Sequence, residues 1–178
     1  RDHAGELELR CRPDTHLLLA ASGNLESFRR TRFNEYDLNH AEGTFRAEVT
    51  PDPRVTLRGV LSLQRDHYPH SRVDVLVRPP ALVDTVDQLD EPTNFELSAT
   101  LRPLRWATLE TGWVRLRTDS NVPRFGYDGQ QVFAGVSLAP RRSGSLGFSW
   151  IYETRDYDTF GPLAARRDHS ATWQVELR

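Results

Sequence analysis

The stretch Phe95-Glu96-Leu97-Ser98-Ala99-Thr100-Leu101, which leads up to Pro103, alternates strictly between apolar and polar side chains. In an extended strand, successive side chains point to opposite faces, so the apolar residues share one face and the polar residues the other. Similar alternation occurs at 7–10, 45–49, 132–138 and 173–177, the first three of these before Pro13, Pro51 and Pro140. The sequence therefore predicts a repeated β-hairpin unit in a sheet with one apolar and one polar face.

The composition narrows the class of protein. Of the 178 residues, 38% are hydrophobic and 27% are charged, which is a lean mixture for the core of a soluble all-β domain. It is typical of transmembrane β-barrels, where only every second residue of a strand meets lipid. No apolar run approaches the ~18 residues of a membrane helix, which excludes a helical membrane protein. A net charge of −2 without a basic stripe argues against a nucleic-acid partner.

The connections between the predicted strands alternate between short proline-containing turns and longer polar segments. The turns lie at Pro13, Pro51, Pro103 and Pro140, and the polar segments at 31–39, 67–92, 118–129 and 157–167. Short turns at one end and long loops at the other are typical of an up-and-down antiparallel barrel of the bacterial outer membrane. We therefore expect an all-β fold in which residues 1–178 form one barrel segment of about nine strands, with 67–92 as its longest loop.

An odd number of strands is unusual, because single-chain bacterial barrels have an even number. The chain also lacks methionine, so we expect a mature or excised segment of a larger barrel. The alternative is a tenth strand formed by Val73, Val75 and Val77. In the sixth strand, Val114 and Leu116 fall on the wrong face, which predicts a β-bulge near Gly112.

Two predicted strands end in aromatic residues next to an Arg-Asp pair: Leu63-Gln64-Arg65-Asp66-His67-Tyr68 and Trp150-Ile151-Tyr152-Glu153-Thr154-Arg155-Asp156-Tyr157-Asp158. With the proline turns, these units resemble large outer-membrane barrels of a β-barrel porin group, and the barrel family that sheathes decahaem cytochromes. The resemblance covers nearly the whole chain. It implies contact with outer-membrane lipid, and either a passive pore or a sheath around a periplasmic or lumenal partner such as a multihaem cytochrome.

A barrel would give the two faces different surroundings. The polar face would line a water-filled lumen with charges of both signs and no dominant one, near which ions and small solutes could be held. The residues predicted to line it are Glu8, Arg10, Arg46, Glu48, Arg58, Glu96, Glu110 and Glu176. The residues predicted to face lipid are Leu57, Phe95, Leu97, Ala99, Val136, Phe148, Trp150 and Trp173. The same polar face could instead contact a plug or partner protein, or be the solvated side of a soluble sheet.

Other candidate sites lack a complete set of groups. Asp84, Asp87, Asp90 and Glu91 offer oxygen ligands but match no calcium loop, and His67 and His70 have no third metal ligand. In Asp168-His169-Ser170, neighbouring side chains on a strand would point to opposite faces, so a base and a nucleophile would not meet. No haem-attachment motif or nucleophile elbow occurs. We therefore expect no cofactor, no metal and no catalytic residue.

Two other functional classes remain open. A soluble β-sandwich, such as an adhesin or a carbohydrate-binding module, would bury its aromatic residues between two sheets. An outer-membrane lipid hydrolase would combine a barrel with a catalytic Ser/His pair.

Overall fold

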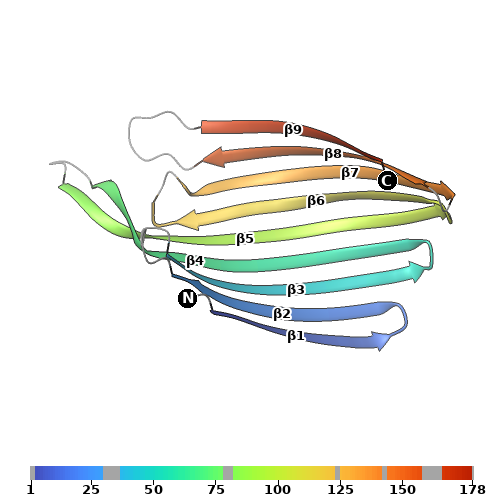
Figure 1. Ribbon diagram of the computed structural model, residues 1–178, viewed down its shortest axis with the longest axis horizontal. Coiled ribbons are helices and arrows are strands. Elements are labelled where there is room, and N and C mark those ends of the chain that lie inside the picture. Colours follow the sequence, from blue (N-terminus) through green and yellow to red (C-terminus); the bar gives the residue numbers. More distant parts are fainter. Residues whose placement is uncertain are drawn as a thin grey trace.

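Nine antiparallel strands lie side by side in one sheet, in the order β1 to β9 along the chain (Figure 1). The computed structural model describes residues 3–29, 37–77, 82–122, 125–141, 144–157 and 166–177, with backbone alone at 3, 70–77, 82–86 and 141. The strands are β1 (His3–Asp14), β2 (Leu17–Phe28), β3 (Leu38–Asp52), β4 (Val55–Val77), β5 (Leu82–Leu104), β6 (Ala107–Ser120), β7 (Tyr127–Arg141), β8 (Gly144–Tyr157) and β9 (Arg166–Leu177). The predicted all-β, up-and-down arrangement of nine strands is confirmed.

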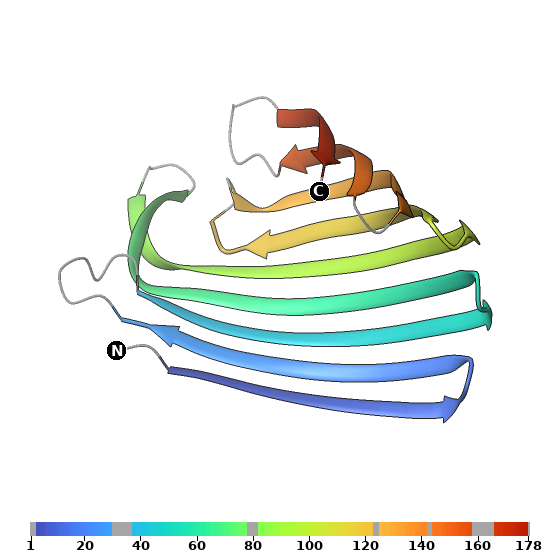
Figure 2. The same ribbon diagram turned by 45° about the vertical axis from the view of Figure 1, so that its right-hand side comes forward.

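The sheet is curved and has two open edges. Figure 2 shows β8 and β9 turning out of the plane in which β1 to β4 lie. Within the described residues, β1 pairs only with β2, and β9 pairs only with β8. Because every neighbouring pair is antiparallel, β1 and β9 run in the same direction. No helix in the described part of the chain is both long and apolar enough to cross a membrane.

The four prolines named above end strands β1, β3, β5 and β7 in the same way. The ladder loses its regular register across each one, because proline has no N–H to donate. The shifts fall between Cys11 and Asp14, Val49 and Asp52, Leu101 and Leu104, and Leu138 and Arg141. The residue before three of these prolines donates its N–H to a turn carbonyl of the preceding hairpin: Thr50 to His16 at 2.8 Å, Arg102 to Arg54 at 2.7 Å, and Ala139 to Trp106 at 2.7 Å. Successive hairpins are thereby joined at their turns.

The predicted long loop at 67–92 is wrong. Strands β4 and β5 run through most of it, and their pairing continues from Arg72 opposite Asp87 to Val77 opposite Leu82, beyond an irregularity after Tyr68. Val73, Val75 and Val77 therefore extend β4 and form no tenth strand. Valine-rich runs on both sides of the connection favour extended pairing, which outweighs the interspersed aspartates. Figure 1 shows this hairpin reaching beyond the other strands.

The predicted bulge near Gly112 is also wrong. Strand β6 pairs with β7 without a register shift from Ala107 to Thr118, so Val114 and Leu116 stay on the polar face. Gly112 has a different role there, because Phe133 lies opposite it. A Cβ at position 112 would lie 2.8 Å from the Leu97 carbonyl oxygen and closer still to the Phe133 ring. The glycine therefore makes room for an aromatic ring over the backbone of β6.

Candidate functional site

The apolar face of the sheet is uncovered in the described structure. Among the described residues, the only buried apolar side chains are Ala107 and Val122. By contrast, Leu9 and Trp173 are each 64% exposed and Leu97 is 49% exposed. Large contiguous apolar surfaces of this kind mark sites of contact with a partner or a membrane. The candidate site is therefore the surface of the sheet itself.

This uncharged surface has sharp limits, and we call it the apolar band. It comprises the outward residues of 7–11 on β1, 17–25 on β2, 41–49 on β3, 55–63 on β4, 95–101 on β5, 107–113 on β6, 132–138 on β7, 146–152 on β8 and 171–177 on β9. Beyond it, the same face becomes polar, for example at Arg65, Arg115, Asp128 and His169. From β2 to β9 the band runs for seven to nine residues along each strand, or about 20–27 Å at ~3.3 Å per residue.

The apolar band crosses the sheet at a slant. A row of hydrogen-bonded partners joins Ala171 on β9, through the intervening strands, to Leu19 on β2. Ala171 ends the band on β9, whereas on β2 the band continues to Leu25, six residues farther. At the opposite border, Leu17 ends the band on β2, and its row of hydrogen-bonded partners reaches Trp173 on β9. On β9 the band continues to Leu177, four residues farther. Four to six residues over seven steps give an angle of about 20–30°, with ~3.3 Å per residue and ~4.8 Å between strands.

Aromatic rings gather on the C-terminal part of the band. Trp173 lies 5.5 Å from Phe148 and 5.9 Å from Trp150, measured between ring centroids. At the border, the Trp113 indole N–H donates to Gln130 at 3.3 Å, and the Tyr152 hydroxyl lies 3.2 Å from His169 Nδ1. Both polar partners lie outside the band. The two border rings thus join the apolar band to the polar zone beyond it.

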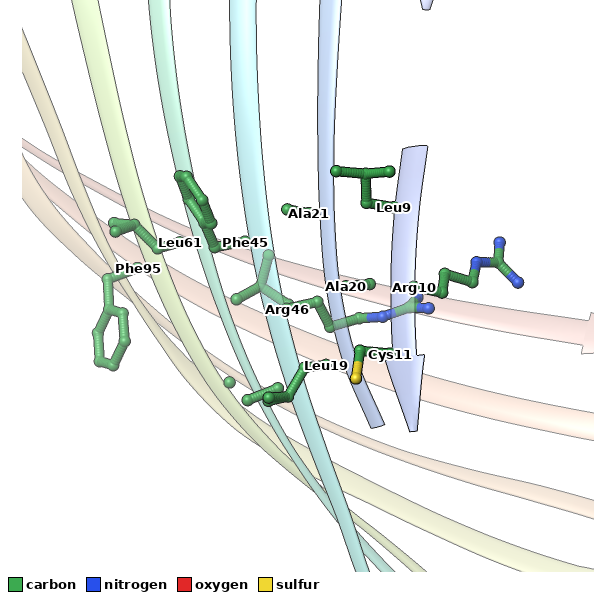
Figure 3. A pocket seen from close by; sticks show the side chains of 13 residues that line it. Leu9, Arg10, Cys11, Leu19, Ala20, Ala21, Phe45, Arg46, Leu61 and Phe95 are labelled. Carbon is green, nitrogen blue, oxygen red and sulfur yellow. The ribbon is translucent and has the colours of Figure 1, made fainter. Parts of the chain in front are cut away.

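The N-terminal part of the band contains a shallow hollow. Its apolar lining includes Leu9, Leu19, Phe45, Leu61 and Phe95 (Figure 3). In Figure 3 the Arg10 side chain extends to the opposite side of β1 from Leu9 and Cys11. Charged and apolar side chains therefore separate at consecutive residues of one strand.

The opposite surface, which we call the polar face, is strongly acidic. Among the side chains that the structure describes, its ladder positions carry twelve carboxylates: Glu6, Glu8, Glu26, Glu42, Glu48, Asp66, Asp90, Glu96, Glu110, Glu153, Asp168 and Glu176. They carry five guanidinium groups: Arg10, Arg46, Arg58, Arg155 and Arg166. The expectation that neither sign dominates is therefore wrong, because Glu42, Asp66 and Asp90 extend this face at the strand ends.

Four of the five arginines pair with carboxylates of this same face. Arg58 Nη2 lies 2.7 Å from Glu96 Oε1 on the neighbouring strand. The other three pair two residues along their own strand: Arg10 with Glu8 at 2.7 Å, Arg166 with Asp168 at 2.6 Å, and Arg155 with Glu153. These pairs neutralise one another locally, so the remaining carboxylates determine the sign of the face.

One polar cluster joins two strands, β3 and β4, near the loop end of this face. His40 Nδ1 lies 2.5 Å from Asp66 Oδ1, and His40 Nε2 lies 3.7 Å from Glu42 Oε2. Glu42 also accepts hydrogen bonds from Ser62 at 2.8 Å and from Thr44 at 3.1 Å. The sequence alone does not reveal this cluster, because His40 and Asp66, 26 positions apart, meet only once the register of β3 on β4 is known.

Carboxylates beyond the apolar band are held in their charged form by local donors. The Thr15 hydroxyl and backbone N–H donate to Asp14 and hold the pKa of that carboxyl below its ordinary value. At the other end, Arg167 lowers the pKa of Asp156, and Arg166 lowers the pKa of Asp168, chiefly through side-chain hydrogen bonds. Both ends of the sheet therefore keep charged groups outside the band.

The structure separates the two predicted sets of site residues. All eight residues predicted to line a lumen lie on the polar face: Glu8, Arg10, Arg46, Glu48, Arg58, Glu96, Glu110 and Glu176. All eight residues predicted to face lipid lie in the apolar band: Leu57, Phe95, Leu97, Ala99, Val136, Phe148, Trp150 and Trp173.

The other candidate groups are not assembled into a site. Asp87 and Glu91 lie on the face opposite Asp90, while the side chains of Asp84 and His70 lie outside the described residues. Within the part of the chain that is described, no three His, Cys, Asp or Glu residues could hold a metal ion. On β9, Asp168 and Ser170 share the polar face, whereas His169 lies on the other side.

Comparisons of the chain with protein-family models, with curated proteins and with solved structures find no match.

Proposed function

We propose that this chain forms part of the wall of a transmembrane β-barrel in a bacterial outer membrane, with the apolar band against lipid and the polar face lining a water-filled pore. The observation that carries the proposal is an uncovered apolar band on all nine strands, free of charged residues and bounded by polar ones. A barrel wall exposes such a belt, about 25 Å tall, to hydrocarbon. Along strands tilted by about 20–30°, the 20–27 Å length of the band on β2 to β9 corresponds to a height of about 17–25 Å, close to that of the belt.

The slant of the band supports a barrel. If the strands were parallel to the membrane normal, the borders of the apolar band would follow the rows of hydrogen-bonded partners. The strands of a closed barrel must tilt, typically by 35–45°, so a membrane crosses those rows obliquely. In our proposal the slant of about 20–30° is this tilt, smaller than the typical value, in a sheet that is already curved (Figure 2).

The polar face supports an aqueous interior. It carries seventeen charged groups, while apolar residues such as Val60, Val114, Phe133 and Ile151 occupy only part of it. A docked protein would require an apolar centre with few charges, so water and small solutes fit this face better than a packed partner. A passive pore is therefore preferred here over a sheath.

Closing the wall requires strands beyond these nine. Since β1 and β9 run in the same direction, direct closure would make a parallel pair in an otherwise antiparallel sheet. An unpaired edge in hydrocarbon would leave backbone groups unsatisfied, at several kcal/mol each. In our proposal, an odd number of additional strands lies between β9 and β1.

Tryptophan fluorescence tests the proposal directly. In variants that retain either Trp173 or Trp106 and carry Phe at the other tryptophan positions, the protein is inserted into vesicles of lipids brominated near the middle of the acyl chain. Trp173, in the apolar band, should be quenched by bromine and protected from aqueous acrylamide, whereas Trp106, in a turn, should show the reverse. If acrylamide reaches Trp173 as well as Trp106 and bromine quenches neither, the membrane proposal is wrong, and a soluble β-sandwich that covers this face becomes the better account.

A further inference from the structure

We propose that the polar face is selective for cations. A pore lined by it attracts cations, repels anions and has no electrostatic effect on neutral solutes. This inference rests on the proposed function, because it takes the polar face to line a pore. Its physical basis is the excess of negative charge on that face. Rings of Asp and Glu are the usual means by which a protein channel favours cations.

The two faces differ in charge balance. The polar face has twelve carboxylates against five guanidinium groups, as named above. On the opposite face, the described side chains at the loop end of the ladders nearly balance: the arginines Arg65, Arg115, Arg117 and Arg167 against the carboxylates Asp87, Glu91, Asp119, Asp128 and Asp156. The excess negative charge therefore belongs to the proposed interior, even though the whole chain has a net charge of only −2.

The pairing pattern keeps this excess from being cancelled locally. Four arginines of the polar face are engaged by Glu8, Glu96, Glu153 and Asp168, as described above. The carboxylates near the loop end have hydroxyl, amide and imidazole partners instead. Asp90, for example, accepts hydrogen bonds from Ser120 at 2.6 Å and from Gln88 at 2.6 Å, and Glu42 accepts them from Ser62 and Thr44. The neutral donors around Asp90 hold it in place without cancelling its charge, whereas Glu42 also lies 3.7 Å from the imidazole of His40, whose pKa is raised chiefly by the hydrogen bond to Asp66.

A negative wall concentrates cations near itself and depletes anions. The effect falls off within a Debye length of about 10 Å at 0.1 M salt, which is comparable to the spacing between charges across two strands. A curved, low-dielectric wall focuses the field further. The selectivity should therefore be strong at low ionic strength and disappear in concentrated salt.

Spin labels on adjacent residues can measure this difference. Asn94 lies on the polar face opposite Ser62, whereas Thr93 lies on the other face beyond the apolar band, close in sequence to Glu91 and opposite Arg117. The protein is labelled at one position or the other and studied in zwitterionic lipid. Relaxation of the label by the tripositive tris(ethylenediamine)chromium ion is compared with relaxation by the trinegative tris(oxalato)chromate ion.

We expect the cation-to-anion ratio at Asn94 to exceed the ratio at Thr93 by about threefold or more at low salt, and the two ratios to converge in 1 M NaCl. The double variant Glu42→Gln, Asp90→Asn keeps an acceptor oxygen at each site and should lower the ratio at Asn94. The matched control, Glu91→Gln with Asp119→Asn, removes two charges from the opposite face and should leave that ratio nearly unchanged. Equal ratios at the two labels, or a larger effect from the control than from the polar-face variant, would overturn the inference.

A third label at Leu97 separates this inference from the proposed function. If oxygen relaxes that label no better than an aqueous complex does, the membrane proposal is wrong whatever the ratio at Asn94. If Leu97 is in lipid but Asn94 shows no cation preference, the membrane proposal is retained and the proposed cation selectivity is wrong.

Discussion

An arginine at Val136 should destabilise the protein in a membrane far more than an arginine at the adjacent Ser137. Val136 lies in the apolar band of β7, between Leu109 on β6 and Phe148 on β8. The band on this strand spans 132–138, so Val136 is one residue, about 3.3 Å along the strand, from its midpoint. At that depth Val136→Arg should cost about 2–4 kcal/mol.

Ser137→Arg is the matched control, because it adds the same side chain at the same depth on the polar face. There the guanidinium meets water and carboxylates, so the change should stay within about 0.5 kcal/mol. The assay is reversible urea unfolding in lipid vesicles, followed by tryptophan fluorescence, for both variants and the unaltered chain. Equal and small effects at the two positions would refute the assignment of the apolar band to lipid.

Three further predictions address packing, closure and pH. Gly112→Ala should lower the free energy of unfolding by about 1–3 kcal/mol, because the added methyl group meets the Leu97 carbonyl and the Phe133 ring, whereas Gly43→Ala, with nothing within 4 Å, should be nearly neutral in the same urea assay. These 178 residues, refolded alone in detergent and added to a planar bilayer, should give no steady single-channel steps, because β1 and β9 are unpaired among the described strands; discrete, lasting steps would contradict the need for more strands. The hydrogen bonds from Thr15 lower the pKa of Asp14, so its charged carboxylate should stabilise the fold above the ordinary carboxyl pKa and stop doing so as the pH falls through the folded-state pKa. Asp14→Asn should therefore lower the urea midpoint of unfolding at pH 7 but not at pH 2. An equal difference at both pH values would count against this assignment.

The faces and the turns were predictable because they depend on local chemistry. Strict alternation at 95–101 is compatible only with an extended strand whose faces differ, and the structure shows that separation at every predicted face residue. The prolines at 13, 51, 103 and 140 have no N–H to donate to a neighbouring strand, whatever the tertiary fold. The ends of the regular pairing could therefore be predicted from the sequence.

The features that were missed depend on pairing between distant residues. The segment around Val73–Val77 contains aspartate and histidine, and only its pairing with β5 makes it a strand. The sequence predicts a bulge at Gly112 because Val114 and Leu116 are apolar, whereas in the structure Phe133 on the neighbouring strand adds a third apolar side chain to the polar face and no bulge occurs. Likewise, the cluster of His40, Asp66 and Glu42 is visible only once the register of β3 on β4 is known.

The central claim is that the apolar band faces lipid and the polar face faces water, and a spin-label scan of 95–101 in lipid vesicles tests it most directly. Each residue is replaced in turn by a labelled cysteine in a chain whose Cys11 is changed to serine, and relaxation by oxygen is compared with relaxation by a neutral, water-soluble nickel complex. Oxygen access should peak at 95, 97, 99 and 101, and nickel access at 96, 98 and 100, with a period of two residues. Equal access to both reagents along the stretch, without alternation, would contradict the account.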